Sequence, residues 1–158
     1  MLWNAESIDQ LNAAKRRAEM LGLKVTSLQL QQFPDDIDPA FEAIKASGAE
    51  MLQVLSSPVF ARYRTRIIEL ASQNHLPTMF IFKAYVTAGG LISYGASRAE
   101  NIRLLARYAV NILKGARPGD LPVEQPTKYE LVINLKTAKT IGADIPTSLL
   151  VRADEVIE

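Results

Sequence analysis

The sequence predicts an α/β fold in which a mostly parallel sheet is flanked by helices. Apolar strand-like runs alternate with amphipathic helical segments over the first 115 residues, a pattern typical of such folds. Two of these runs, 50–57 and 76–82, are mostly apolar rather than alternating, which indicates strands buried on both faces. The chain has 158 residues, of which 48% are hydrophobic and 22% charged, so it is long enough for one domain with a substantial core.

The expected elements follow from apolar spacing and from the residues that start and stop helices. Ser7 and Ser97 each stand three residues before a glutamine or glutamate, the spacing of a capping box. Gly22, Gly48 and Gly115 each follow the last apolar position of a helical segment. In chain order, we expect a strand stub at 2–4, a helix at 7–21, a strand at 24–31, a helix at 38–48, a strand at 50–57, a helix at 58–75, a strand at 76–82, a short insert at 83–90, a strand at 91–95 and a helix at 97–114.

The alternation of strand and helix stops after residue 115. Residues 114–128 contain three prolines and two glycines, which indicates an extended surface connection. We expect a strand that runs into a short helix over 129–142, and a final apolar segment with acidic residues over 143–158. No internal repeat or low-complexity tract is present.

Composition and motifs exclude several classes of function. The net charge is +1 and no basic tract with interleaved aromatic residues is present, so nucleic acid is not an expected partner. With no cysteine and the single histidine His75, the chain lacks thiolate and two-histidine metal sites, and we expect no metal and no cofactor. It also lacks the Gly-x-Ser-x-Gly elbow, and we predict no catalytic residue. Gly89 and Gly90 precede a strand, so we expect a turn with positive φ there, not a phosphate loop.

Small polar and aromatic side chains gather where the strands are expected to end. In open parallel sheets, ligands bind beyond the carboxyl ends of the strands. Such side chains orient and stack a ligand rather than cleave it. The candidate ligand-binding residues are Asn4, Ser56, Ser57, Phe82, Tyr85, Ser93, Tyr94 and Gly95. For Asn4 and the two serines, a role as plain helix caps is an equally good interpretation. No arginine or aspartate stands clearly at a strand end to clamp an amino acid.

Two stretches of the sequence are more specific than these patterns. "AGGLISYG", residues 88–95, and "GDLPVEQPTKYELVINLKTAK", residues 119–139, resemble the C-terminal part of the ABC-transporter substrate-binding proteins of the tryptophan/tyrosine type. The resemblance covers the whole chain, since "LWN" followed by a helix resembles the start of that family's second lobe. It implies a type I periplasmic binding protein fold, in which two α/β lobes face each other across a cleft.

The resemblance also implies a division of the chain, which would be the C-terminal portion of such a protein. Residues 1–96 would form the α/β core of the second lobe. Residues 97–126 would be a helix and a connection that pack on the missing first lobe. Residues 127–158 would be the C-terminal crossing strand and helix.

The function that the resemblance implies is that of a non-enzymatic solute-binding component of an ABC importer. It would bind a small ligand such as tryptophan, tyrosine or phenylalanine between the lobes and deliver it to an ABC permease. The family resemblance implies a periplasmic location, whereas the chain shows no signal peptide and would be cytoplasmic if made at this length. The alternative is a cytoplasmic small-molecule effector-binding or interaction module without a transport role. A Rossmann-like enzyme is a weaker alternative, because the glycine-rich fingerprint is absent.

A lobe without its partner would leave an apolar face exposed on the helix at 97–114. We expect Leu104, Tyr108 and Ile112 to lie on that face. Exposed apolar patches favour self-association, so a homodimer through this lobe face is expected.

Overall fold

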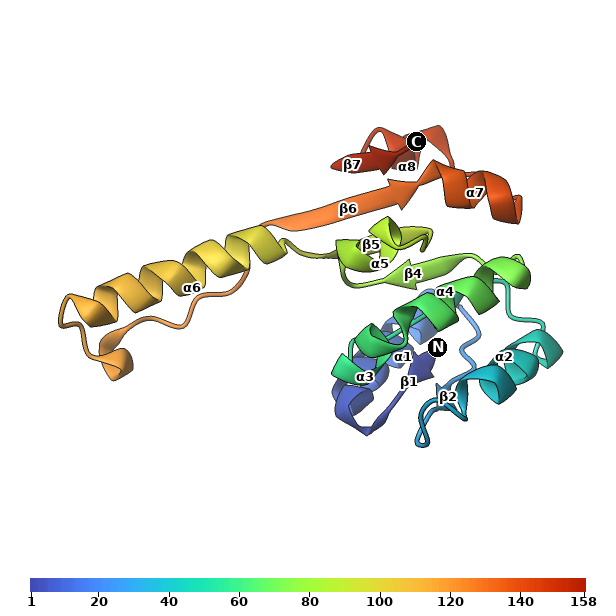
Figure 1. The fold of residues 1–158 in the computed structure, drawn as a ribbon, viewed down its shortest axis with the longest axis horizontal. Coiled ribbons are helices and arrows are strands. Elements are labelled where there is room, and N and C mark those ends of the chain that lie inside the picture. The colour runs from blue at the N-terminus through green and yellow to red at the C-terminus, as the bar shows by residue number, and fades with distance from the viewer.

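The computed structural model describes all 158 residues. Strands and helices alternate from β1 to β5, and the long helix α6 and the strand β6 follow (Figure 1). The strands are β1 (Leu2–Trp3), β2 (Leu28–Gln29), β3 (Leu52–Gln53), β4 (Thr78–Phe80), β5 (Ile92–Ala96), β6 (Tyr129–Asn134) and β7 (Glu155–Ile157). The helices are α1 (Ile8–Met20), α2 (Ile37–Ala46), α3 (Pro58–Arg62), α4 (Arg64–Gln73), α5 (Lys83–Thr87), α6 (Arg98–Leu113), α7 (Leu135–Ile141) and α8 (Thr147–Leu150), with the 3-10 turns η1 (Ala5–Ser7) and η2 (Pro118–Asp120).

The strands form two hydrogen-bonded groups that a single bridge joins. β1 pairs with β2, and β3 to β7 pair in the order of their numbers. Leu2 of β1 also bridges to Val54 directly after β3, so the order across the layer is β2-β1-β3-β4-β5-β6-β7. Every pairing is parallel except that of β5 with β6. The prediction of an α/β fold with a mostly parallel sheet and flanking helices is therefore confirmed.

The main core lies between the first strands and the helices α2, α3 and α4. Phe41 of α2, Phe60 of α3 and Phe80 of β4 are its largest fully buried side chains. Leu2 and Leu52 bring the strands β1 and β3 into the same cluster. These residues stand on the apolar faces that sequence periodicity predicts, and their burial holds α2 and α4 against the sheet.

Several expected elements are shorter than their apolar runs. The strand expected at 24–31 is reduced to β2, since only Leu28 and Gln29 pair with β1. The helix expected at 58–75 is divided at Tyr63, whose ring stacks on Phe33 with centroids 5.8 Å apart. The expected helix ends are confirmed by positive φ angles of 69°, 64° and 101° at Gly22, Gly48 and Gly115.

Only one of the two glycines before β5 has the positive φ expected of both. Gly89 has a φ of 108°, whereas Gly90 does not lie in that region. A Cβ at Gly90 would lie 2.9 Å from the carbonyl oxygen of Tyr85 and would press on the ring of Phe80. The second glycine is therefore required by close packing on β4 and α5 rather than by a left-handed turn.

Helix α6 projects away from the rest of the molecule, and none of its residues is buried (Figure 1). The connection that follows it returns along one side. There Tyr108 Oη donates to the carbonyl oxygen of Pro122 at 2.7 Å, and Arg107 forms an ion pair with Glu124. Leu104 and Tyr108 are half-buried as a result, so the expectation that they are exposed is wrong. Ile112 is exposed, as expected.

The C-terminal segment returns to the body through an antiparallel ribbon of β5 and β6. The register pairs Ile92 with Ile133 at one end and Ala96 with Tyr129 at the other. Asn134 then caps α7, because its Oδ1 accepts from the Thr137 N–H at 3.0 Å while its Nδ2 donates to the Val86 carbonyl at 3.1 Å. The expected strand leading into a short helix is thus confirmed. Every helix is too short or too polar to cross a membrane.

Candidate ligand-binding site

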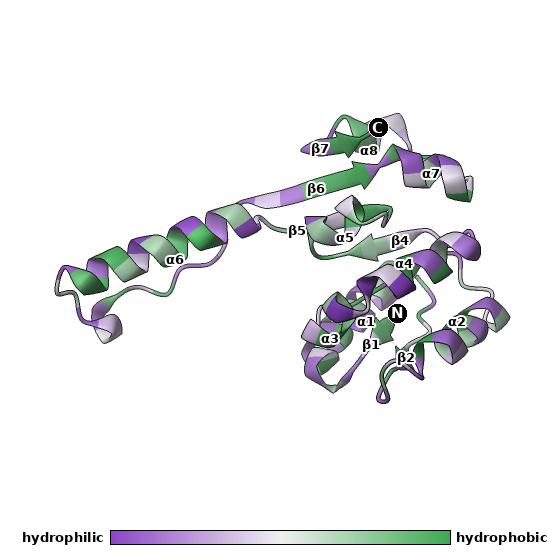
Figure 2. Ribbon diagram, in the orientation of Figure 1, coloured by the Kyte–Doolittle hydropathy of each residue, from purple (hydrophilic) through white to green (hydrophobic).

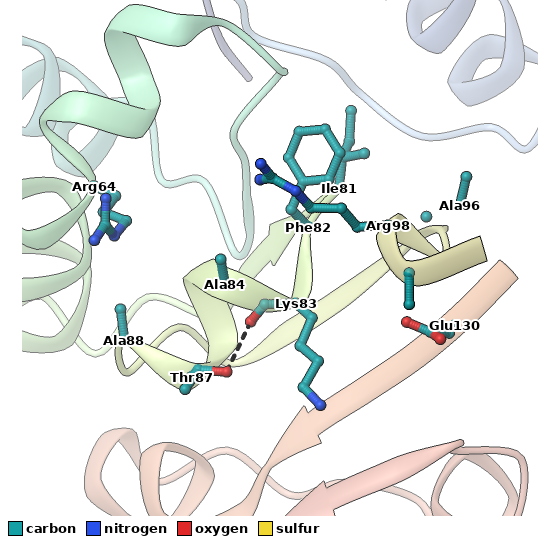
Figure 3. Close-up of a pocket in the computed structure, with 12 residues that line it drawn as sticks. Arg64, Ile81, Phe82, Lys83, Ala84, Thr87, Ala88, Ala96, Arg98 and Glu130 are labelled. Atoms are coloured by element: carbon teal, nitrogen blue, oxygen red, sulfur yellow. Dashed lines mark hydrogen bonds between the residues drawn. The ribbon is translucent and has the colours of Figure 1, made fainter. Parts of the chain in front are cut away.

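A pocket of about 670 Å³ lies beyond the carboxyl end of β4, where α4, α5, the end of β5 and the start of α6 come together (Figure 3). Parallel strands end at this edge of the sheet, which is where ligands bind in open α/β folds. The volume suits a small organic ligand. The lining residues are Arg64, Ile81, Phe82, Lys83, Ala84, Thr87, Ala88, Gly95, Ala96, Arg98, Ala99 and Glu130.

The pocket combines an apolar wall with charged groups of both signs. Ile81, Phe82 and several alanines supply the apolar wall, and Phe82 is 40% exposed. Two of the three cationic side chains, Arg64, Lys83 and Arg98, bind groups of the chain itself. Arg64 donates to the Ala61 carbonyl at 3.0 Å, and Lys83 forms an ion pair with Glu155.

Arg98 and Glu130 form neither an ion pair nor a side-chain hydrogen bond, whereas Arg64, which also lacks an ion pair, donates to a backbone carbonyl. Arg98 is the first residue of α6, directly after the cap Ser97, whose side chain accepts from the Glu100 N–H. Glu130 lies on β6 and pairs in register with Gly95 of β5. A guanidinium and a carboxylate without partners are able to bind a carboxylate and an ammonium group of a ligand.

Gly95 allows β5 to pack directly on the end of β4. A Cβ at this position would fall inside 3.0 Å of the Ile81 carbonyl oxygen, a separation that real Cβ atoms essentially never show. It would also lie 3.1 Å from the Ile81 carbonyl carbon. The absence of a side chain therefore brings the start of α6, with Arg98, to the pocket.

A separate polar cluster lies at the carboxyl ends of β1 and β3. Asn4 Nδ2 donates to Ser57 Oγ at 2.8 Å, and Ser57 Oγ donates to Glu6 Oε2 at 2.9 Å. Gln10 holds Ser56 through both backbone groups, at 2.9 and 3.1 Å. Ser57 also caps α3 by accepting from the Val59 N–H at 3.2 Å. The structure supports the helix-cap interpretation for Ser57, and the hydrogen bond from Asn4 to Ser57 also joins two strand ends.

The structure places the eight candidate residues in different surroundings. Phe82 and Gly95 line the pocket, and Asn4, Ser56 and Ser57 lie in the polar cluster. Tyr85, Ser93 and Tyr94 lie in neither place, and each has a physical reason for its position.

Tyr85 is a core residue and is not available as a stacking wall for a ligand. Its ring stacks on Phe80 with centroids 4.7 Å apart, and the residue is only 5% exposed. Burial raises the pKa of the Tyr85 hydroxyl, with a smaller opposing effect from Arg64. The short helix α5 turns this side chain back onto the sheet, which the sequence pattern does not indicate.

Ser93 and Tyr94 lie within β5, because this strand continues to Ala96 instead of ending at Gly95. Ser93 pairs with Phe80 and Val132, and its buried hydroxyl has no hydrogen-bond partner. Tyr94 is half exposed and stacks on Tyr129 with centroids 5.8 Å apart. Successive side chains of a strand point to opposite faces, so Tyr94 lies on the face opposite Gly95 and Glu130.

Sequence reasoning missed the charged residues of the pocket. Arg64 stands among the α4 arginines that look like a solvated helix face. The sequence could have indicated Arg98 as a pocket residue, since it directly follows a predicted cap at the end of a strand. It could not have indicated Glu130, because the position of Glu130 depends on the antiparallel register of β5 and β6.

An α/β layer with a ligand-sized pocket at the carboxyl ends of its strands is typical of small-molecule-binding proteins. The chain belongs to the ABC transporter substrate binding protein family, whose model matches residues 3–157. The resemblance seen in the sequence is thereby confirmed. No protein with a curated description is similar enough to count as a match.

Solved structures support the family and the fold. A conserved domain protein from Vibrio cholerae O1 biovar El Tor is 26% identical with a TM-score of 0.88, and the match covers 98% of this chain and 53% of that one. An ABC domain from Streptococcus pneumoniae, solved in complex with L-Trp, is 26% identical with a TM-score of 0.87, covering 99% and 53%. A ligand-free, open substrate binding protein with adhesive properties from Clostridium difficile is 19% identical with a TM-score of 0.72, covering 99% and 52%, and shows the fold alone. The chain spans about half the length of these structures.

Proposed function

We propose that this chain binds a small zwitterionic solute, an amino acid with an apolar or aromatic side chain, in the pocket beyond β4. The observation that supports the proposal is an apolar wall beside two side chains of opposite charge, Arg98 and Glu130, neither of which forms an ion pair. Arg98 would bind the carboxylate, Glu130 the ammonium group, and Phe82 the apolar side chain. The role is binding and not catalysis.

The proposed ligand class has support from a relative and from the pocket itself. The Streptococcus pneumoniae structure contains L-Trp, and that protein aligns with almost the whole of this chain. The pocket of about 670 Å³ is large enough for an indole or phenol side chain. Tryptophan, tyrosine and phenylalanine are therefore the first ligands to test.

The proposed biological role is delivery of this solute to an ABC permease on the outer side of the cytoplasmic membrane, in the periplasm where one exists. The pocket opens to solvent, so a facing lobe would supply the second wall and close over the ligand by a hinge movement. The structures that the chain matches are about twice as long, which leaves room for such a lobe.

Isothermal titration calorimetry with L-tryptophan, L-tyrosine and L-phenylalanine tests the proposal. We expect heat of binding with at least one of them, and a 10- to 100-fold weaker affinity, as an order of magnitude, for Arg98→Ala and for Glu130→Gln. Arg103→Ala is the matched control, since Arg103 lies on the same helix outside the pocket and should leave the affinity unchanged. Absence of heat with all three amino acids, for this chain and for a version carrying a facing lobe, would refute the proposed ligand class.

A further inference from the structure

Positive charges outnumber negative charges in the pocket beyond β4. The lining residues include three cations, Arg64, Lys83 and Arg98, and one anion, Glu130. A zwitterionic ligand with an apolar side chain offers one group of each sign, so it has no counterpart for two of the cations. Lys83 directly follows Phe82 in the chain, and both residues line the pocket. A free ammonium group at this place would attract a ligand whose side chain carries a carboxylate.

The ammonium group of Lys83 is not free, because it forms an ion pair with Glu155 of β7. Glu155 itself does not line the pocket. Figure 3 shows that the Lys83 side chain points away from Phe82 and Arg98. An ammonium group that is paired with a carboxylate has little net charge left to attract a second anion. The ion pair therefore reduces the excess of positive charge in the pocket.

Strand pairing holds the carboxylate of Glu155 on the side of the sheet where the pocket lies. Directly before β7, Asp154 Oδ2 accepts from the Leu131 N–H at 2.8 Å, and Glu155 then pairs in register with Val132 of β6. Figure 2 shows that β6 is hydrophilic at its start, where Glu130 lies, and hydrophobic further along, where Val132 lies. Side chains two residues apart on a strand share a face, so Val132, Glu130 and the registered Glu155 lie on one face of the sheet.

The remaining cation, Arg64, is less suited to bind an acidic side chain of a ligand. Its guanidinium donates to the Ala61 carbonyl at 3.0 Å. Figure 3 shows Arg64 apart from Arg98 and Glu130, which are the residues proposed to bind the charged groups of the amino acid. Lys83 is thus the cation beside the apolar wall whose charge bears on the choice of side chain.

We propose that Glu155 is a specificity-determining residue that acts through Lys83. By neutralising Lys83, Glu155 lowers the affinity of the pocket for amino acids with an acidic side chain, and those with an apolar side chain are preferred. The inference rests on the proposed binding of an amino acid in this pocket. Specificity is a difference between two affinities, so withdrawing an attractive charge from the wrong ligand is sufficient to produce it. The Lys83 and Glu155 side chains are 48% and 43% exposed, so the effect is modest.

Calorimetry at low ionic strength, with L-glutamate titrated against bound L-phenylalanine, measures this preference. For Glu155→Gln, we expect the preference for L-phenylalanine over L-glutamate to fall about 3- to 5-fold, because the charge of Lys83 is no longer neutralised. Glu158→Gln is the matched control, since it changes the net charge equally. Glu158 is exposed, lies just beyond the same strand and forms no ion pair, so the preference should stay unchanged.

The double variant Lys83→Gln/Glu155→Gln tests whether the effect passes through Lys83, and it should lack the gain in L-glutamate affinity. If L-glutamate binds Glu155→Gln no more tightly than it binds the natural chain, or if the gain persists in the double variant, the inference is overturned. Binding of L-phenylalanine in the same experiments leaves the proposed function in place. Absence of heat with every amino acid, for the natural chain and for a version carrying a facing lobe, would instead refute the proposed function and this inference with it.

Discussion

Replacement of Gly95 by alanine tests how the pocket is assembled. The added Cβ would collide with the carbonyl oxygen of Ile81 and would lie 3.1 Å from its carbonyl carbon and 3.0 Å from its Cγ2. Two of these three atoms belong to the backbone, which cannot move aside as a flexible side chain does. Overpacking of this kind destabilises proteins by about 1–3 kcal/mol, and the rigid neighbour places Gly95→Ala near about 3 kcal/mol.

Urea unfolding followed by circular dichroism measures this effect. Gly119→Ala is the matched control, because a Cβ there would meet no atom within 4 Å and its φ is not in the left-handed region. The control should change the free energy of unfolding by less than about 0.5 kcal/mol. Equal unfolding midpoints for the two variants would refute the argument that close approach to Ile81 requires glycine at this position.

Three further predictions follow from the core, a cap and a titrating side chain. Phe80→Ala removes a buried ring that packs on Tyr85, and should lower the free energy of unfolding by about 3–5 kcal/mol in urea titrations. Ser57→Ala removes the cap of α3 and leaves Asn4 Nδ2 without its 2.8 Å partner, so a loss of about 1–2 kcal/mol is expected in the same assay, and no loss would contradict the capping role. The pKa of Asp36 is held below its ordinary value of 3.8, because the carboxylate accepts hydrogen bonds from the backbone N–H groups of Gln32 and Gln31. The contribution of these bonds to the free energy of unfolding is therefore complete well above pH 3.8. It is lost as the pH falls through that value toward the lower pKa of the folded state. Unfolding curves from pH 6 to pH 2 should show a shallower acid-induced loss for Asp36→Asn than for the natural chain, and parallel curves would argue against this contribution.

The parts of the fold that could be predicted from sequence depend on local signals. Helix ends at Gly22 and Gly48 follow from the need for positive φ, and helix starts at Ser57 and Ser97 follow from cap chemistry. The alternation of these elements is sufficient to predict a parallel sheet, and the rule that ligands bind at carboxyl ends then locates the functional edge.

The parts that could not be predicted depend on contacts between distant segments. Glu130 reaches the pocket only because β6 pairs with β5 in antiparallel register, and no local pattern specifies that register. Tyr85 looks like a ligand contact because it follows a strand end, yet the stacking of its ring on Phe80 makes it part of the core. The cover over Tyr108 comes from a proline-containing connection whose path has no periodic signal.

Ligand-induced changes in the amide NMR spectrum test most directly whether the pocket beyond β4 is the binding site. On titration with L-tryptophan, we expect the amide signals of residues that line the pocket, such as Phe82, Gly95 and Arg98, to shift together and to saturate at one affinity. Signals from the polar cluster of Asn4 and Ser57 should stay in place, because that cluster lies at the ends of other strands. Shifts that gather at Asn4 and Ser57 while those of the pocket remain fixed would contradict the account.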